Sequence, residues 1–336
     1  MAQAWAPGRV NLIGDHTDHT GGLVLPMAID LGTTVTGDAG GDHVALRSAT
    51  EREPAVIPLG VADPAAMTPS WARYVAGVVA ELHPAVGFTG EVTTTLPVGG
   101  GLSSSAALEV AVAVALGFDG DVVTLAQLCQ RAEQRASGVP CGIMDQLTSV
   151  AGVEGHALRI DCTTLEVRPV PLPDDLEVVV VDSGQPRDLA TSPYAERAAA
   201  CAAAQAQIGP LAEASLADIE RIDDDTVRRR ARHVVTENHR VDEFAVALKA
   251  GDRGALREVL AGSHASLRDD FDVSTATLDA LVDALVSMDG VIGARLTGAG
   301  FGGCLVALVE RGTTVSLPNR MWRVVASRGA HLRVPS

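Results

Sequence analysis

One segment near residue 100 limits the possible folds more than any other part of the chain. Residues 96–107 read LPVGGGLSSSAA, preceded by a β-branched run at 92–96 and followed by an alanine- and valine-rich run to about residue 116. Glycines let a backbone turn tightly, and free N–H groups at the start of a helix attract anions. The segment therefore predicts a strand, a glycine turn and a helix whose N-terminus binds phosphate. An ordinary turn with a serine N-cap is the alternative.

The segment matches neither of the common nucleotide-binding loops. It lacks the Gly-Lys-Ser/Thr of a Walker A loop and the spacing of G-x-G-x-x-G. Three consecutive hydroxyls follow the glycines, and such hydroxyls can cap the helix or supply oxygen to a hydrated Mg²⁺. Because Lys249 is the single lysine of the chain, a lysine cluster cannot be the phosphate site.

The length and the order of elements favour an α+β fold with two domains. The chain has 336 residues, more than one core usually holds. Its hydrophobic content is 47% but its aromatic content only 3%, so the core must be aliphatic. Strand-like and helix-like segments alternate without a regular βαβ rhythm. We expect domains at 1–170 and 171–336, because prolines cluster at 167–175.

The element boundaries are expected from hydrophobic periodicity and from glycine and proline positions. Strands are expected at 4–13, 23–29, 33–36, 92–96, 176–181, 293–296 and 305–309. Helices are expected at 103–116, 124–136, 141–151, 194–207, 225–249, 253–264 and 274–288.

Charge and cysteine usage exclude several classes of partner. The formal net charge is −16, which repels nucleic acid and anionic lipid. The five cysteines form no pair with metal-ligand spacing, and no apolar run is long enough to cross a membrane. We expect a cytoplasmic protein, a monomer or weak homodimer, that binds small molecules.

A second glycine-bounded segment, residues 8–22, concentrates charged and imidazole side chains. Arg9, Asp15, His16 and Asp18 lie within it. Carboxylates and imidazoles on one loop suit the recognition of a polyhydroxyl compound. A solvated charged loop and a metal site that also uses His19 are the alternatives.

A third glycine-rich segment, LTGAGFGGC at 296–304, lies between two expected strands. Its backbone can pack closely against a ligand or another loop, or it can form a hairpin turn. The pattern alone favours neither interpretation.

The three segments together are similar to the signature motifs of the GHMP kinase superfamily. Residues 8–22, GRVNLIGDHTDHTGG, resemble the galactokinase-family signature GRVNLIGEHTDYNGG. Residues 140–146 (PCGIMDQ) and 192–197 (SPYAER) resemble further family segments, as do 236–241 and 263–270. The matches occur in the family's order over nearly the whole chain.

The resemblance implies the GHMP kinase fold, with an S5-like N-terminal domain, a ferredoxin-like C-terminal domain and the active site between them. It also implies ATP-dependent phosphorylation of galactose at the C1 hydroxyl, giving galactose 1-phosphate and ADP, with Mg²⁺ as the cofactor. In such a transfer the protein mainly positions groups and offsets charge.

The resemblance assigns roles position by position. Catalysis is expected from Arg9 and from Asp145, the latter either as a general base or as an orienting and electrostatic group. Glu133 is expected to bind Mg²⁺ with one serine of the cluster, taken as Ser104. The sugar contacts are expected from Asp15, His16, Asp18, Gly142 and Tyr194. The ATP contacts are expected from Gly99, Gly100, Gly101, Leu102, Ser103, Ser104, Ser105, Ala106 and Trp71.

Three positions depart from the family signature: Asp15 stands for Glu, His19 for Tyr and Thr20 for Asn. The family glutamate is associated with the C6 end of the sugar, and a carboxylate one methylene shorter leaves ~1 Å to be filled. A hydrogen-bonding site of this kind can discriminate strongly between substrates. A kinase for L-arabinose or N-acetylgalactosamine is therefore one alternative. A non-catalytic sugar sensor related to the family is a separate alternative, although the serine cluster, Glu133 and Asp145 are all present. Residues 185–189 also differ from the family and could reshape one wall of the sugar site.

Overall fold

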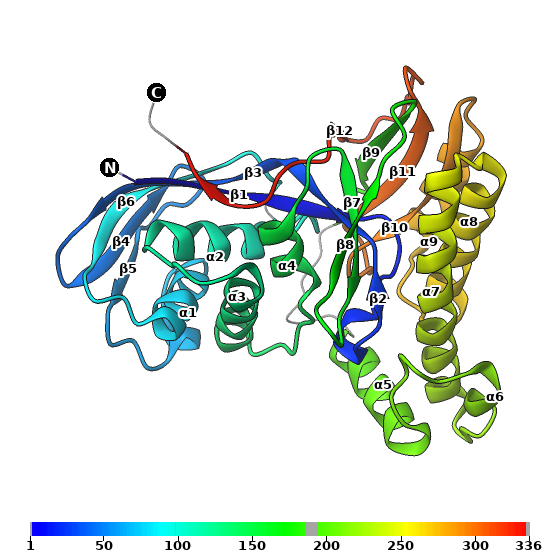
Figure 1. The fold of residues 1–336 in the computed structure, drawn as a ribbon, viewed down its shortest axis with the longest axis horizontal. Helices are drawn as coiled ribbons and strands as arrows, with labels where there is room; N and C mark the ends of the chain where they lie inside the picture. The colour runs from blue at the N-terminus through cyan, green and yellow to red at the C-terminus, as the bar shows by residue number, and fades with distance from the viewer. Residues whose placement is uncertain (1, 98, 186–193, 334–336) are drawn as a thin grey trace.

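A computed structural model describes residues 2–97, 99–185 and 194–333, and its first half is built on a twisted six-stranded sheet (Figure 1). The strand order is β13-β1-β3-β6-β4-β5, antiparallel except for the parallel β4–β6 pair. The strands are β1 (Ala2–Asn11), β3 (Pro26–Ala39), β4 (His43–Ser48), β5 (Ala55–Pro58), β6 (Phe88–Thr94) and β13 (His331–Leu332).

Four helices cover one face of this sheet (Figure 1). They are α1 (Ala72–Leu82), α2 (Ser104–Ala115), α3 (Val122–Ser137) and α4 (Met144–Ala151). The buried residues between them and the sheet are mostly alanine and valine, as the composition predicts. The ends of α3 follow local rules: Asp121 accepts from the Thr124 N–H at 2.8 Å, and Gly138 ends the helix with φ 72°.

The second half contains a four-stranded antiparallel sheet of order β10-β11-β9-β12. Its strands are β9 (Leu176–Asp182), β10 (Val291–Thr297), β11 (Cys304–Glu310) and β12 (Met321–Val324). Val179 and Val181 of β9 pack in a core with helix residues such as Leu267, whereas Val178 and Val180 pack with Met27 of β3. Burial on both faces explains why β9 is a continuous apolar run.

Helices lie along one side of this second sheet and below it, and a small third sheet lies between the halves (Figure 1). The helices are α5 (Tyr194–Ile208), α6 (Leu216–Ile219), α7 (Asp225–Ala250), α8 (Arg253–Asp269) and α9 (Ala276–Val286). The third sheet pairs β2 (Leu23–Val24), β7 (His156–Asp161) and β8 (Val167–Pro171). Short 3₁₀ turns occupy Asp18–Thr20 and Pro64–Ala66. No helix in the described part of the chain is both long and apolar enough to span a membrane.

The α+β class and the expected helices are confirmed, with corrections at the strands. The separate strands expected at 23–29 and 33–36 are wrong: β2 ends at Val24, and β3 then runs unbroken from Pro26 to Ala39. Gly32 marks a close approach rather than a break, because a Cβ there would lie 2.5 Å from the Ala6 carbonyl oxygen of β1. The helix expected from residue 141 begins at Met144.

Helix α1, strands β4 and β5, strands β7 and β8, and the two C-terminal strands were not anticipated from the sequence. Helix α1 has a β-branched core face, Val75, Val78 and Val79, which reads equally well as a strand. The C-terminal strand β13 returns to pair with β1 of the first sheet.

The division of the chain into domains at residue 170 stays a prediction.

Helices α1 and α3 meet closely at Gly77, where an added Cβ would lie 2.4 Å from the Ala132 carbonyl oxygen. We predict that Gly77→Ala lowers the free energy of unfolding by about 1–2 kcal/mol, because overpacking outweighs the ~1 kcal/mol gain in helix propensity. Gly254→Ala, on the exposed first turn of α8, should be neutral or stabilising. Urea denaturation of both variants tests this, and a stabilised Gly77→Ala protein would refute it.

Candidate active site

The three glycine-rich segments meet at one cavity of about 470 Å³ between the two halves of the chain. The sugar-signature loop contributes Arg9, Asp15, His16 and Asp18 to its wall, and the third segment contributes Gly298 and Ala299. The remaining wall includes Trp71, Tyr74, Gly99, Glu133, Cys141, Gly142, Asp145, Gln146 and Tyr194. Segments up to about 290 residues apart in sequence therefore form one site.

Arg9 and Asp145 form the central ion pair of this cavity. Arg9 Nε donates to Asp145 Oδ1 at 2.8 Å, and Nη2 lies 2.7 Å from the same oxygen. Ser103 Oγ donates to Asp145 Oδ2 at 2.5 Å, so both carboxylate oxygens are held by the protein. Asp145 lies in the first turn of α4, whose start no side chain caps. Its carboxylate is thus directed to Arg9 and Ser103 rather than to its own helix.

Arg9 also fixes the glycine-rich turn before α2. Its Nη1 donates to the Gly101 carbonyl oxygen at 2.7 Å, and the Leu102 carbonyl accepts from the Arg9 N–H at 3.2 Å. Gly99 and Gly101 have φ of 76° and 82°, in the left-handed region that favours glycine. Ser103 shares this region with φ 56°, which is strained for a serine. Gly99 of this turn lines the cavity, whereas the Gly100 N–H donates to the Pro97 carbonyl oxygen at 3.1 Å.

The predicted ATP-binding residues differ in what they can offer. Leu102 and Ala106 are fully buried in the core, so they can contribute backbone groups alone. Ser104 and Ser105 are partly exposed. Trp71 is mostly buried beside α1, and its Nε1 donates to the Glu53 carbonyl at 3.1 Å. With Tyr74, Ala136 and Val139, Trp71 forms an apolar end of the cavity.

A group of carboxylates lies behind the serines. Ser105 Oγ donates to Glu133 Oε1 at 2.9 Å, and Gln146 Nε2 donates to Glu133 Oε2 at 2.5 Å and to Glu109 Oε2 at 3.3 Å. Burial and the nearby Asp145 carboxylate raise the pKa of Glu133 to about 7. Burial is the main cause, and the nearby Glu133 carboxylate the second, of a pKa for Glu109 well above its usual range. This wall of the cavity therefore carries an excess of acidic groups that a cation would stabilise.

The predicted sugar contacts, Asp15, His16, Asp18, Gly142 and Tyr194, all line the same cavity. Asp18 lies directly against Gly142, where an added Cβ would come within 1.9 Å of Asp18 Oδ2, so residue 142 has to be glycine. The His16 ring centre lies 5.8 Å from that of Tyr194 and 4.5 Å from that of Phe271. Among the described residues, no cluster of three His, Cys, Asp or Glu side chains could hold a metal, so the metal interpretation of this loop gains no support. Residues 186–193, which include most of the predicted variable wall at 185–189, lie outside the described residues.

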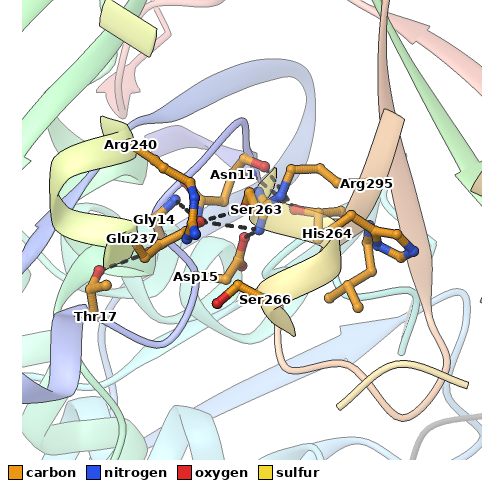
Figure 2. A network of polar contacts seen from close by, with 12 residues as sticks. Asn11, Gly14, Asp15, Thr17, Glu237, Arg240, Ser263, His264, Ser266 and Arg295 are labelled. Carbon is orange, nitrogen blue, oxygen red and sulfur yellow. Dashed lines mark hydrogen bonds and ion pairs between the residues drawn. The ribbon is translucent and has the colours of Figure 1, made fainter. Parts of the chain in front are cut away.

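Asp15 is held more tightly than the sequence suggests (Figure 2). It is 1% exposed; its Oδ2 pairs with Arg295, and its Oδ1 accepts from the Gly298 N–H at 2.7 Å. The third glycine-rich segment thus packs against the sugar-signature loop. A direct contact between Asp15 and a sugar stays a prediction.

Sequence reasoning missed Arg295, Glu237, Gln146 and Glu109. The one local signal for Arg295 is a lone charge within an apolar strand, VIGARLT. Glu109 gives a similar signal, a single acid within the apolar helix α2. An isolated charge in a buried element requires a partner, but its identity is set by the tertiary fold.

Comparisons with known proteins agree with this geometry. Family models match the chain as "Galactokinase galactose-binding signature" at residues 3–38, "GHMP kinases N terminal domain" at 73–153 and "GHMP kinases C terminal" at 244–317. The chain is 44% identical to the galactokinase of Homo sapiens, over 91% of this chain and 83% of that protein. It is 43% identical to the galactokinase of Roseiflexus sp. strain RS-1, again over 91% of this chain and 83% of that protein.

Solved structures show the same architecture. The structure of Lactococcus lactis galactokinase complexed with galactose superposes with a TM-score of 0.91 at 33% identity, covering 98% of this chain and 94% of that one. Methanococcus jannaschii mevalonate kinase superposes with a TM-score of 0.71 at 19% identity, covering 97% and 98%, which shows the shared fold alone. The expected GHMP kinase fold is therefore confirmed.

His19 provides a pH-dependent test of the sugar end of the cavity. Burial alone would lower the pKa of His19, but Asp18, whose Oδ1 lies 3.8 Å from Nδ1, and Cys201 outweigh it and raise the pKa to about 9. A raised pKa in the folded state stabilises the protein below the unfolded pKa, near 6.5, and this contribution is lost as the pH rises to 9. Between pH 6.5 and 9, the native protein should lose roughly 1–3 kcal/mol of unfolding free energy relative to His19→Gln. Urea unfolding at several pH values measures this, and parallel profiles for the two proteins would show that His19 carries no such charge.

Proposed function

The chain belongs to the galactokinase family of GHMP kinases, and from this premise we propose how its cavity phosphorylates galactose. It is a galactokinase-type enzyme that transfers the γ-phosphoryl group of ATP to the C1 hydroxyl of galactose, giving galactose 1-phosphate and ADP. The observation that carries the proposal is the meeting of the Arg9–Asp145 pair, the sugar-signature loop and the glycine-rich start of α2 at one cavity.

Asp145 is the residue we assign to the reacting hydroxyl. Arg9 and Ser103 hold its two carboxylate oxygens, which leaves further lone pairs able to accept a hydrogen bond from the C1 hydroxyl. In this position Asp145 either receives the hydroxyl proton or orients the hydroxyl for in-line attack on the γ-phosphorus. Arg9 stabilises negative charge at the same point, because its guanidinium is permanently charged and nearly buried.

The nucleotide is assigned to the other end of the cavity. Gly99, which lines the cavity, and the N–H groups and positive dipole end at the start of α2 suit the phosphates. The apolar pocket beside Trp71 and Tyr74 suits the base. Arg9 connects the two ends because it holds both Asp145 and the Gly101 carbonyl.

The acidic wall fits the Mg²⁺ that the family implies. Mg²⁺ prefers hard oxygen ligands and uses one or two carboxylates together with phosphate and water. Glu133 and a hydroxyl of the serine cluster, Ser104 in our assignment with Ser105 beside it, would supply such oxygens. Burial, followed by the Asp145 carboxylate, raises the pKa of Glu133, and a bound cation would favour the ionised carboxylate. When bound, Mg²⁺ offsets the charge of the β- and γ-phosphates. Glu133 is held in place for this by Ser105 and Gln146.

Galactose is the substrate that the relatives support, since the relatives from Homo sapiens, Roseiflexus sp. and Lactococcus lactis are named galactokinases. Nothing in the comparisons favours L-arabinose, N-acetylgalactosamine or a sensor function. Small molecules, the sugar and ATP, are the binding partners. We further propose that the enzyme acts in the cytoplasm, which suits buried reduced cysteines such as Cys129 and Cys201. We also propose that it is a monomer or weak homodimer.

The sugar assignment is tested with a panel of galactose, L-arabinose and N-acetylgalactosamine, with ADP release measured in the presence of ATP and Mg²⁺. Galactose should give the highest kcat/KM. Asp15→Glu, which restores the family residue, should retain that preference. A higher kcat/KM for another sugar would overturn the choice of galactose, and no sugar-dependent ADP release would overturn the kinase assignment.

The role of Asp145 is tested by Asp145→Asn, which keeps the shape of the side chain. We predict that kcat falls by about 10²–10⁴-fold, because the amide neither accepts the proton nor carries the charge. Galactose binding, measured by isothermal titration calorimetry, should change far less. Turnover above a tenth of the native value would exclude Asp145 as the essential group.

A further inference from the structure

Arg295 is a fully buried arginine in the middle of β10, close to the sugar-signature loop but outside the cavity wall. Its guanidinium pairs through Nη2 with Asp15 Oδ2, and its Nη1 donates to the Leu12 carbonyl oxygen at 3.0 Å. Glu237 Oε1 of α7 lies 3.8 Å from Nη2 (Figure 2). One side chain thus joins a strand and a helix of the second half to a loop of the first.

The charges around Arg295 balance within the buried cluster. Arg295 and Arg240 face Asp15 and Glu237, with Arg240 Nη1 2.9 Å from Glu237 Oε2. Burial would raise the pKa of Glu237, but His233, Arg295 and Arg240 outweigh it and lower that pKa, so Glu237 stays ionised. Burial lowers the pKa of His233, although the nearby Glu237 carboxylate acts in the opposite direction. Removal of Arg295 would leave Asp15 as a buried charge without its main partner.

The same cluster holds the backbone of the loop on both sides of Asp15. Glu237 Oε1 accepts from the Gly14 N–H at 3.1 Å and from Ser263 Oγ at 2.6 Å. His233 Nε2 lies 3.0 Å from the Asp15 carbonyl oxygen. The loop is therefore held from outside by α7, α8 and β10 (Figure 2). These contacts add to its internal hydrogen bonds, such as that from Thr17 Oγ1 to the Gly14 carbonyl oxygen at 2.9 Å.

The loop needs this external support because its backbone is strained at the cavity. His16, the residue after Asp15, has φ 65°, which costs of order 1–3 kcal/mol for a residue other than glycine and persists where neighbours enforce it. This conformation brings the His16 ring near Tyr194 and is followed by Asp18 against Gly142. Asp15 also accepts from the N–H of Gly298, which lines the cavity.

We propose that Arg295 is a positioning residue for the sugar site, an inference that rests on the proposed galactokinase function. Acting through Asp15, it holds the segment from Asp15 to Asp18 against the turn at Gly298, and so sets the affinity for galactose. The apolar pocket beside Trp71 and Tyr74, assigned to the nucleotide, is formed by elements of the first half. Loss of Arg295 is therefore expected to weaken sugar binding selectively.

The test compares Arg295→Met and Arg295→Lys with a matched control, Arg159→Met. Arg159 also forms an ion pair with an aspartate, because its Nε lies 2.6 Å from Asp242 Oδ1 of α7, but this pair lies at the surface. Arg295→Met should raise the KM for galactose and the calorimetric Kd for galactose about tenfold or more, because small misplacements of binding groups are costly. The KM for ATP should change less than about twofold, and Arg159→Met should match the native protein.

Arg295→Lys keeps the charge but lacks the fork that reaches both Asp15 and Leu12. It should recover part of the galactose affinity, and it carries the test alone if Arg295→Met does not fold. Equal changes in the two KM values, or an unchanged Kd for galactose in a folded variant, would overturn the positioning role. A native protein without galactose-dependent ADP release would instead refute the proposed function, whatever the variants do.

Discussion

The Arg9 side chain is the contact on which the rest of the active site depends. Its guanidinium binds Asp145 of α4 and the Gly101 carbonyl before α2, and its backbone N–H binds Leu102. Strand β1, the glycine-rich turn and α4 are therefore fixed to one another at a single cation. An arginine suits this place because it stays charged when nearly buried and its donors are arranged as a rigid fork. In an enzyme with a net charge of −16, such local cations must offset the charge of a nucleotide.

The same principle is repeated at the other side of the sugar-signature loop. There Arg295 of β10 is buried between Asp15 and Glu237, so an arginine far away in the sequence holds the segment that begins with Arg9. The two arginines have different roles. Arg9 lines the cavity beside Asp145, whereas Arg295 lies behind the cavity wall and contacts Asp15. The glycine-rich turn at 298–303 belongs to this second contact, since the Gly298 N–H binds Asp15. Buried ion pairs contribute little net stability on average, but each defines one geometry.

The parts of this structure that the sequence predicts are those encoded locally. Helices α3 and α7 have their own caps, Asp121 and Asp224, and glycine C-caps, so their bounds follow from short-range rules. The site residues Arg9, Ser103 and Asp145 lie in continuous motifs that can be compared with a family. Arg295 could not be assigned in this way, because its partner Asp15 is 280 residues away and the strand around it shows an isolated charge alone. The Glu109–Gln146–Glu133 contacts were missed for the same reason, since each member lies on a different helix.

Catalysis in this account is the placing of one sugar hydroxyl between a fixed carboxylate–arginine pair and a phosphate held at a helix start. The most direct test is a crystal structure of the protein with galactose, Mg²⁺ and a non-hydrolysable ATP analogue. We expect the C1 oxygen at hydrogen-bond distance, about 2.6–3.2 Å, from a carboxylate oxygen of Asp145, with the γ-phosphate analogue on the Arg9 side. Galactose bound outside this cavity, or with its C1 hydroxyl turned away from Asp145, would contradict it.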